Sequence, residues 1–305
     1  MAGTRPLLVI LGPTASGKSA LAEAVAAAVG GEILSVDSMQ VYRGMDVGTA
    51  KPTPAERARV RYHGIDLVDP DQTFTTARFV AGADATIAAA TAPLVATGGT
   101  PLYYKALFEG LFDGPPADPT VRQRLQAEPG EALHRRLSQV DPTAAARIHA
   151  NDLKRVVRAL EVFELTGRPI SSFQTDWADP QPRHPAKWFG LAWDKDVLNR
   201  RINARVKTML AAGWIDEVRG LLDRFGDLSP TAGEATGYRE LIDHLRGRRS
   251  LLDAAEAIKI ATRQLARRQM KWFRRFPQVT WLPGDRPLAE HVAAVLDHWV
   301  VNRNR

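Results

Sequence analysis

The sequence contains no cysteine, which excludes disulfide bonds, cysteine-based zinc sites and thiol nucleophiles. It has no apolar run near the roughly 20 residues that a membrane-spanning helix needs, and its N-terminus has no signal-peptide pattern. Its histidines show no metal-ligand spacing, and no internal repeat or low-complexity tract is present. We therefore expect a cytoplasmic protein with no membrane partner.

What the chain does have is an ordinary globular composition with an excess of positive charge. It is 305 residues long, 45% hydrophobic and 25% charged, with a net charge of +7. The length allows one large domain or two medium ones. The charge favours a polyanionic partner, but many basic proteins have none, so nucleic-acid binding stays open on charge alone.

A glycine-rich stretch near the N-terminus organises the chain. It follows an apolar run at residues 7–11 and precedes an alanine-rich helical pattern at residues 20–29. This is the strand, loop and helix spacing of a P-loop, whose backbone N–H groups bind a diphosphate or triphosphate. Lys18 could reach a phosphate oxygen, and the Ser19 hydroxyl could bind Mg²⁺. The candidate phosphate-binding residues are Gly12, Pro13, Thr14, Ala15, Ser16, Gly17, Lys18 and Ser19.

The order of the elements predicts an α/β fold, a P-loop NTPase-like parallel sheet flanked by helices. We expect strands at residues 7–11, 32–36, 93–97, 188–193 and 279–282. Helices at 119–127, 130–140, 142–148 and 153–165 predict a helical insertion domain over residues 115–185, within a catalytic core formed by 1–114 and 186–305. The C-terminal part is largely helical, with patterns at 196–212, 215–224, 234–245, 254–276 and 287–301.

Polar residues follow two of the predicted strands. Asp37 comes directly after the second strand, and Thr100 follows the third strand and its Gly98-Gly99 turn. Ligands of open parallel sheets bind beyond the carboxyl ends of the strands. Both side chains are therefore expected beside the P-loop. No aspartate of the Walker-B kind ends the third strand.

The helix predicted at residues 254–276 has one apolar and one basic face. An apolar stripe predicts its buried side, comprising Ile258, Ala261, Leu265, Trp272 and Phe276. Another face carries Arg263, Arg267, Lys271 and Arg274, and no acidic residue lies between 258 and 276. These cations favour a track for a phosphate backbone, with a merely solvated face as the alternative. A second, shorter basic cluster comprises Lys154, Arg155 and Arg158.

Taken together, the motifs resemble the tRNA dimethylallyltransferase family, also called tRNA isopentenyltransferases. The most specific match is the run from Ser35 to Pro52, SVDSMQVYRGMDVGTAKP. The resemblance extends from about residue 7 to about residue 282, and the absence of a zinc-binding extension fits the bacterial type. The other matching motifs lie at residues 12–19, 98–100, 155–161, 237–239 and 262–269.

That resemblance implies the transfer of a dimethylallyl group from dimethylallyl diphosphate to N6 of the adenosine 3′ of the anticodon, in tRNAs reading codons that begin with U. It implies Mg²⁺ as cofactor, the tRNA anticodon stem-loop as partner, and a monomer. Asp37 would be the general base, with Thr14, Thr100 and Arg219 as further catalytic residues, and Gln40 could pair with an adenine edge. The implied tRNA-binding residues are Asp37, Ser38, Met39, Gln40, Thr100, Arg122, Lys154, Arg155, Val156, Val157, Arg158, Arg239, Arg263, Arg267, Lys271 and Arg274.

Two other classes share part of this pattern. A P-loop small-molecule kinase would have the same first strand, loop and helix, and the insertion lies where a kinase lid would. An RNA-binding NTPase would combine the loop with the basic faces. Both should turn over ATP, whereas a prenyltransferase should be indifferent to it.

Overall fold

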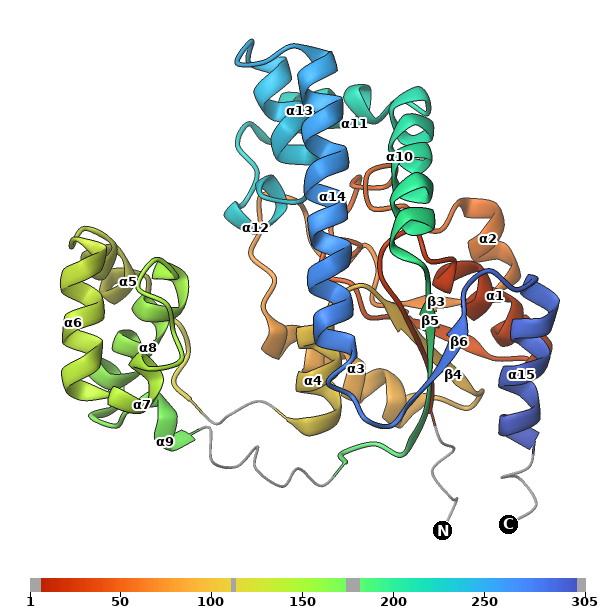
Figure 1. The fold of residues 1–305 in the computed structure, drawn as a ribbon, viewed down its shortest axis with the longest axis horizontal. Coiled ribbons are helices and arrows are strands. Elements are labelled where there is room, and N and C mark those ends of the chain that lie inside the picture. The colour runs from red at the N-terminus through yellow and green to blue at the C-terminus, as the bar shows by residue number, and fades with distance from the viewer. Residues whose placement is uncertain (1–6, 111–113, 174–181, 301–305) are drawn as a thin grey trace. The chain divides into compact units, whose positions relative to one another are not determined.

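The structure, a computed structural model, describes residues 7–110, 114–173 and 182–300 (Figure 1). Six strands form one sheet in the order β3-β2-β4-β1-β5-β6, and all of its neighbouring strands are parallel. Every residue of β1 and β4 is buried, as is usual where both faces of a parallel sheet are covered. The strands are β1 Leu7–Leu11, β2 Glu32–Ser35, β3 Tyr62–His63, β4 Leu94–Gly98, β5 Ala186–Ala192 and β6 Val279–Pro283.

Different helices cover the two faces of the sheet. Leu8 and Ile10 of β1 belong to one core cluster, together with α1 (Lys18–Val29) and α15 (Leu288–Val300). Leu7 and Val9 belong to the other, with α3 (Thr76–Ala89), α4 (Pro101–Glu109) and α14 (Leu251–Phe273). The alternation of β1 between the two clusters follows from the two-residue period of a strand. Because β1, β2 and β4 are parallel, the loops that follow them all start at the same edge of the sheet.

The helices that follow β5 pack together and against the loop after β2. They are α10 (Lys195–Ala211), α11 (Trp214–Phe225), α12 (Pro230–Gly233) and α13 (Tyr238–Leu245), and α14 packs against both α10 and α13. Trp214 is almost fully buried, between Gly48 and Gly237. A Cβ atom at either glycine would come within about 2.1 Å of the Trp214 ring, so only glycine fits there. The segment after β2 is thereby joined to the C-terminal helices (Figure 1).

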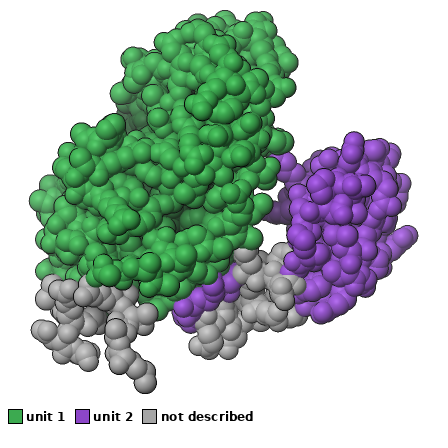
Figure 2. Space-filling view, turned by 180° about the vertical axis from the view of Figure 1, so that it is seen from behind, with its two compact units in different colours: residues 1–108, 184–305 green, residues 109–183 purple. Residues whose placement is uncertain are grey.

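Residues 109–183 form a second compact unit, and residues 1–108 and 184–305 form the first (Figure 2). The sequence placed these boundaries at 114/115 and 185/186. The second unit has its own core, which includes Leu125, Leu133, Leu137 and Leu160. It is helical as expected, with α5 Pro119–Gln126, α6 Gly130–Val140, α7 Pro142–Ala145, α8 Leu153–Thr166 and α9 Ile170–Phe173.

The predicted fold class, a P-loop-type parallel sheet with flanking helices, is confirmed. The sequence did not predict α2 (Pro54–Arg59), β3, α9 or α12, all of which are short. Among the described residues, no helix is both long enough and apolar enough to cross a membrane.

Candidate active site

The P-loop occupies residues 12–17, between β1 and α1. Gly17 has φ +94° and begins α1, and Ala15 also has a positive φ of +63°. A Cβ atom at Gly12 would lie 2.7 Å from the Ser16 hydroxyl oxygen, which explains the first glycine. The N-terminus of α1 then offers its free N–H groups, and the helix dipole adds to them. The loop has the geometry of an anion site.

Two side chains, one just after β5 and one on α10, bind this loop from outside. Arg201 donates its Nε–H to the Ala15 carbonyl at 2.9 Å, and the Trp193 indole N–H donates to the Ser16 carbonyl at 2.8 Å. The Arg201 guanidinium also lies over the Trp193 ring, 4.2 Å from its centroid. Two carbonyl groups of the P-loop are thereby hydrogen-bonded by Trp193 and Arg201, and the sequence did not predict either contact.

Three charged groups lie within electrostatic reach of one another at this loop. Burial and, to a smaller extent, the nearby Arg205 lower the pKa of Lys18 to about 8, although Asp37 acts in the opposite direction. Burial also lowers the pKa of the Arg205 guanidinium, again opposed by Asp37. Arg205 forms no hydrogen bond or ion pair with any described residue. Two cations and one carboxylate therefore leave a net positive charge for an anionic ligand.

The family resemblance implies that Arg219 binds the diphosphate, and this stays a prediction; what the structure describes is the contact of Arg219 with a side chain of its own helix. Arg219 is on α11, its side chain is half exposed, and it donates to Asp216 on the same helix. The arginine that the structure brings to Lys18 and Asp37 is Arg205 of α10. Both arginines occur in helical patterns, so spacing alone could not distinguish them.

Asp37 and Thr100 meet at the sheet edge as predicted. The Met39 amide donates to Asp37 Oδ1 at 2.9 Å, and the Gly99 amide donates to Oδ2 at 3.3 Å. The Ser38 amide donates to the Thr100 hydroxyl oxygen at 2.9 Å, which ties the turns after β2 and β4 together. Asp37 is partly exposed, so its carboxylate is fixed in orientation yet accessible.

Gln40 has its own partners within the protein. Its Oε1 accepts a hydrogen bond from the Ser35 hydroxyl at 2.8 Å, and its Nε2 lies 3.3 Å from the carbonyls of both Thr49 and Ala50. Both ends of the amide are therefore engaged. Gln40 stabilises the loop that follows it, and its pairing with an adenine edge stays a prediction.

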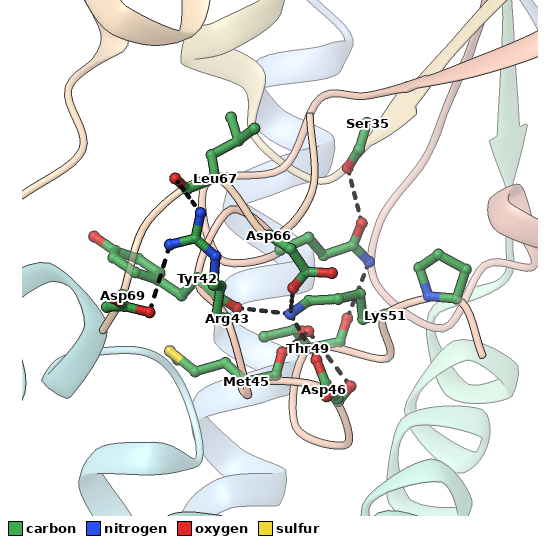
Figure 3. A network of polar contacts seen from close by, with 12 residues as sticks. Ser35, Tyr42, Arg43, Met45, Asp46, Thr49, Lys51, Asp66, Leu67 and Asp69 are labelled. Atoms are coloured by element: carbon green, nitrogen blue, oxygen red, sulfur yellow. Dashed lines mark hydrogen bonds and ion pairs between the residues drawn. The ribbon is translucent and has the colours of Figure 1, made fainter. Parts of the chain in front are cut away.

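That loop is organised around a buried lysine (Figure 3). The Lys51 side chain is fully buried, and its ammonium group donates to the Tyr42 carbonyl, Asp46 and Asp66 at 2.6 to 2.7 Å. Arg57 binds the other oxygen of Asp66 at 2.6 Å. Burial would raise the pKa of Asp66, but the bonds from Lys51 and Arg57 outweigh it and hold that pKa below its ordinary value.

Glu217 of α11 binds the tip of the same loop. Its carboxylate accepts the amides of Asp46, Val47 and Gly48 at 2.8, 2.6 and 3.2 Å. The Tyr238 hydroxyl donates to it as well, at 2.6 Å. Residues 46–51 are therefore a rigid part of the site's surroundings, although their sequence has few periodic signals.

Helix α14 carries the predicted basic face, but its buried side differs from the prediction. Arg267, Lys271 and Arg274 are exposed, while Arg263 donates to the Asn203 side chain at 2.9 Å. The predicted apolar stripe is right for Ile258 and Phe276, whereas Ala261, Leu265 and Trp272 are only half buried. The buried residues within the helix are Ala254, Ile258, Ala266, Gln269 and Phe273.

Within the insertion, several expected tRNA contacts have structural partners. Val156 and Val157 are buried in the core of the unit, so their side chains are not available to RNA, which corrects that expectation. Arg122 and Arg158 bind the fully buried Glu161. Burial raises the pKa of Glu161, but these two arginines outweigh it and lower that pKa. Lys154 and Arg155 are exposed.

Two predicted residues remain, Arg239 and Ser19. Arg239 of α13 is mostly exposed and binds the adjacent Glu240 at 3.0 Å. Ser19 is exposed on the first turn of α1. In the part of the chain that the structure describes, no group of three or more His, Asp or Glu residues could hold a metal ion. A hydroxyl beside a phosphate cradle suits Mg²⁺, which binds substrate oxygens and water as well as protein.

The fold and site define a class: a P-loop protein whose phosphate cradle lies beside a carboxylate that follows the second strand. Two family models match it, one described as IPP transferase over residues 40–276 and one described as isopentenyl transferase over residues 6–65. The chain belongs to the IPP transferase family. This membership confirms the predicted family and supports prenyl transfer over the small-molecule kinase.

The chain is also similar to proteins with assigned names. It is 50% identical over 298 residues to a tRNA dimethylallyltransferase of Symbiobacterium thermophilum, covering 94% of this chain and 92% of that protein. It is 47% identical over 287 residues to the one from Geobacter metallireducens, covering 91% and 93%.

Solved structures agree over almost the whole chain. The full-length tRNA isopentenylpyrophosphate transferase of Bacillus halodurans has a TM-score of 0.72 and 36% identity, covering 99% of this chain and all of that one. A eukaryotic dimethylallyltransferase, crystallised in snapshots of its action on tRNA, has a TM-score of 0.84 and 25% identity, covering 98% and 80%.

Proposed function

We propose that this chain transfers a dimethylallyl group from dimethylallyl diphosphate to N6 of the adenosine 3′ of the anticodon, in tRNAs that read codons beginning with U. The names of its relatives support prenyl transfer to tRNA. The observation that carries the proposal is Asp37, a partly exposed carboxylate fixed by two amides within electrostatic reach of Lys18 and Arg205. This pairing suits a reaction in which diphosphate leaves and a proton is removed.

The P-loop side of the site binds the leaving group. As the bond between the allylic carbon and the diphosphate oxygen breaks, negative charge grows on the diphosphate. The N-terminal amides of α1, Lys18 and Arg205 are fixed donors that stabilise this charge without reorganising. We assign Arg205 this role in place of Arg219, because Arg205 has no other partner among the described residues.

The Asp37 side of the site accepts the proton. The adenine N6 lone pair is conjugated with the ring, so the amine is a poor nucleophile that must lose a proton as its bond to carbon forms. Each Asp37 oxygen accepts one backbone amide, which leaves further lone pairs for the N6 proton. The adenosine has to leave its stack to reach this carboxylate, as bases do in other nucleic-acid-modifying enzymes.

Mg²⁺ is the cofactor that we propose, with the Ser19 hydroxyl as its protein ligand. When bound, the ion would neutralise charge on the diphosphate. The hydroxyl, diphosphate oxygens and water provide the oxygen ligands that Mg²⁺ prefers. Thr14, in the same loop, is close enough in sequence to donate to the same diphosphate.

We propose two surfaces for the tRNA backbone. One is the basic face of α14 and its C-cap, comprising the exposed Arg267, Lys271 and Arg274 beside the partly buried Arg263, and the other comprises the exposed Lys154 and Arg155 of the insertion. Exposed cations of this kind bind phosphates by releasing counterions. A single chain contains the cradle, the carboxylate and these cations, so we propose that a monomer is sufficient for the reaction, and we propose a cytoplasmic location.

The test is transfer to an unmodified tRNA transcript that has adenosine 3′ of its anticodon, with dimethylallyl diphosphate, Mg²⁺ and no ATP. Mass spectrometry of the digested tRNA should detect one dimethylallyl group on that adenosine. Asp37→Asn keeps the shape but cannot accept the proton, so the transfer rate should fall by about 10²–10⁴. Binding of tRNA, measured by fluorescence anisotropy, should stay within about twofold.

A transcript with guanosine at the same position serves as the control and should remain unmodified. ATP consumption is followed in parallel. Consumption of ATP without any prenyl group on the tRNA would refute the proposed function and favour the kinase. Full activity of Asp37→Asn would remove Asp37 from the reaction while leaving the transferase assignment intact.

A further inference from the structure

A buried glutamine on α14 connects the two halves of the site. Gln269 is only 5% exposed, in a stripe whose other buried members are apolar. Its Oε1 accepts the Thr14 amide of the P-loop at 2.9 Å, and its Nε2 donates to the Gly99 carbonyl at 2.6 Å. The two ends of one rigid amide group therefore bind the turn after β1 and the turn after β4.

The turn after β4 leads directly to Asp37. The Gly99 carbonyl accepts from Gln269, while the amide of the same residue donates to Asp37 Oδ2 at 3.3 Å. A continuous path of hydrogen bonds thus runs from Thr14 through Gln269 and Gly99 to Asp37. One end of it belongs to the phosphate cradle, and the other is the carboxylate beside that cradle.

The local geometry is built for this contact. A Cβ atom at Gly99 would lie 2.7 Å from Gln269 Nε2, so a larger residue at position 99 would push the amide away. An amide buried among apolar side chains is costly unless both of its ends are hydrogen-bonded, and here both are. Packing alone would be satisfied by methionine, which has a similar length and no directional bonds.

We propose that Gln269 is a positioning residue for the transfer reaction, which sets the distance and angle between the diphosphate cradle and Asp37. The inference rests on the proposed function. In the reaction, the allylic carbon has to lie between the departing diphosphate and the attacking N6, so an error in the spacing of the two turns misaligns the bond that forms with the bond that breaks. Misplacement by about 1 Å can lower a rate by about 10²-fold.

The test compares Gln269→Met with Gln264→Met, the same substitution at an exposed glutamine of the same helix. With both substrates saturating, kcat of Gln269→Met should fall by about 10- to 100-fold, since alignment and not binding is lost. Its KM for dimethylallyl diphosphate and its Kd for inorganic diphosphate should stay within about threefold. Gln264→Met should match the wild type in all three quantities.

The pattern of changes separates positioning from other roles. An unchanged kcat for a folded Gln269→Met would overturn the proposal, as would a higher KM and Kd at constant kcat, which would make Gln269 a binding residue. Gln269→Glu is the second variant. It retains an acceptor for the Thr14 amide but places an oxygen against the Gly99 carbonyl, and it should lose kcat as Gln269→Met does.

One measurement on the wild type needs neither variant nor activity. Amide hydrogen exchange at Thr14 should be slow in the free enzyme, comparable with the first bonded amides of α1, because Gln269 binds that N–H. Fast exchange at Thr14 would refute the linkage even if transfer occurs. Failure of wild-type transfer with slow exchange at Thr14 would instead refute the proposed function and leave the linkage standing.

Discussion

Replacing Lys51 by methionine should destabilise the core unit strongly, although Lys51 is a charged residue. Its ammonium group is fully buried and has three acceptors, the Tyr42 carbonyl, Asp46 and Asp66. Methionine keeps the volume and removes the charge. Two carboxylates then face each other without their shared cation, and the Tyr42 carbonyl loses its donor (Figure 3).

The size of the effect follows from how much water can compensate. Removing one partner of a buried ion pair costs about 3–5 kcal/mol. Asp46 is 56% exposed and can be solvated, and Asp66 keeps Arg57. We therefore expect the lower end of the range, about 3 kcal/mol. The matched control is Arg43→Met, which removes a cation of the same loop that binds Asp69 at the surface and should cost about 1 kcal/mol or less.

The assay is urea unfolding at pH 7, followed by tryptophan fluorescence. Six of the seven tryptophans lie in residues 184–305, so the signal reports mainly the unit that contains Lys51. Adding Asp66→Asn to Lys51→Met should recover part of the loss, because it removes one of the two facing charges. A cost for Lys51→Met no larger than that of Arg43→Met would refute the account of the loop as a buried ionic network.

Acid titration checks the same network. The pKa of Asp66 is held below its ordinary value in the folded chain. A carboxyl group of this kind stabilises the fold above its unfolded-state pKa, and that contribution disappears as the pH falls through the folded-state pKa. Since Lys51→Met removes one of the cations responsible, stability of the variant should depend less on pH in the acid range than that of the wild type.

Two further predictions concern the substrates. Because the pKa of Lys18 is about 8, its charge is lost above that pH, so kcat/KM for dimethylallyl diphosphate should fall on the alkaline side with a midpoint near 8. A midpoint that is unchanged in Lys18→Arg, whose charge persists, would contradict this assignment. The second prediction neutralises three exposed cations of α14 and its C-cap, Arg267, Lys271 and Arg274. Binding of tRNA should weaken, and the slope of log K against log salt should fall by about two to three. An unchanged slope would mean that this face is solvated and does not bind the tRNA backbone.

The sequence predicted the sheet, the P-loop and the meeting of Asp37 with Thr100 because each depends on local patterns. Apolar runs give buried strands, and the carboxyl ends of parallel strands meet at one edge whatever the connections between them. The helical insertion followed from its periodicity and its Gly/Pro-rich borders. Short elements such as β3 and α12 escaped because they are held by their neighbours and have no period of their own.

The residues that hold the site in place could not be predicted in the same way. Gln269 is 255 positions from Thr14, and Arg201 is 186 positions from Ala15, so only the folded chain brings them together. An apolar stripe does not include Gln269, because the glutamine side chain is polar. The useful signal was a polar residue at core spacing, between Ala266 and Phe273.

Gln40 and Arg158 show what a motif does not distinguish. Each has the side chain that an RNA-binding residue needs, and each lies in a motif of the family, yet each has internal partners that stabilise the protein. A motif marks residues that matter, but it does not separate those that touch the ligand from those that support them. Hydrogen-bond partners make that separation, and for Val156 and Val157 burial alone does so.

The C-terminal helices therefore have a second role beside the RNA contacts that their charge predicts. Outward bonds of the P-loop reach Trp193, Arg201 and Gln269, and the loop that follows Asp37 is bound by Glu217. The cradle and the base come from the first hundred residues, but their relative geometry is fixed by residues beyond 190. Since α14 exposes cations on one side and binds both active-site turns through Gln269 on another, RNA held on its basic face would rest on the same rigid element that aligns the reacting groups.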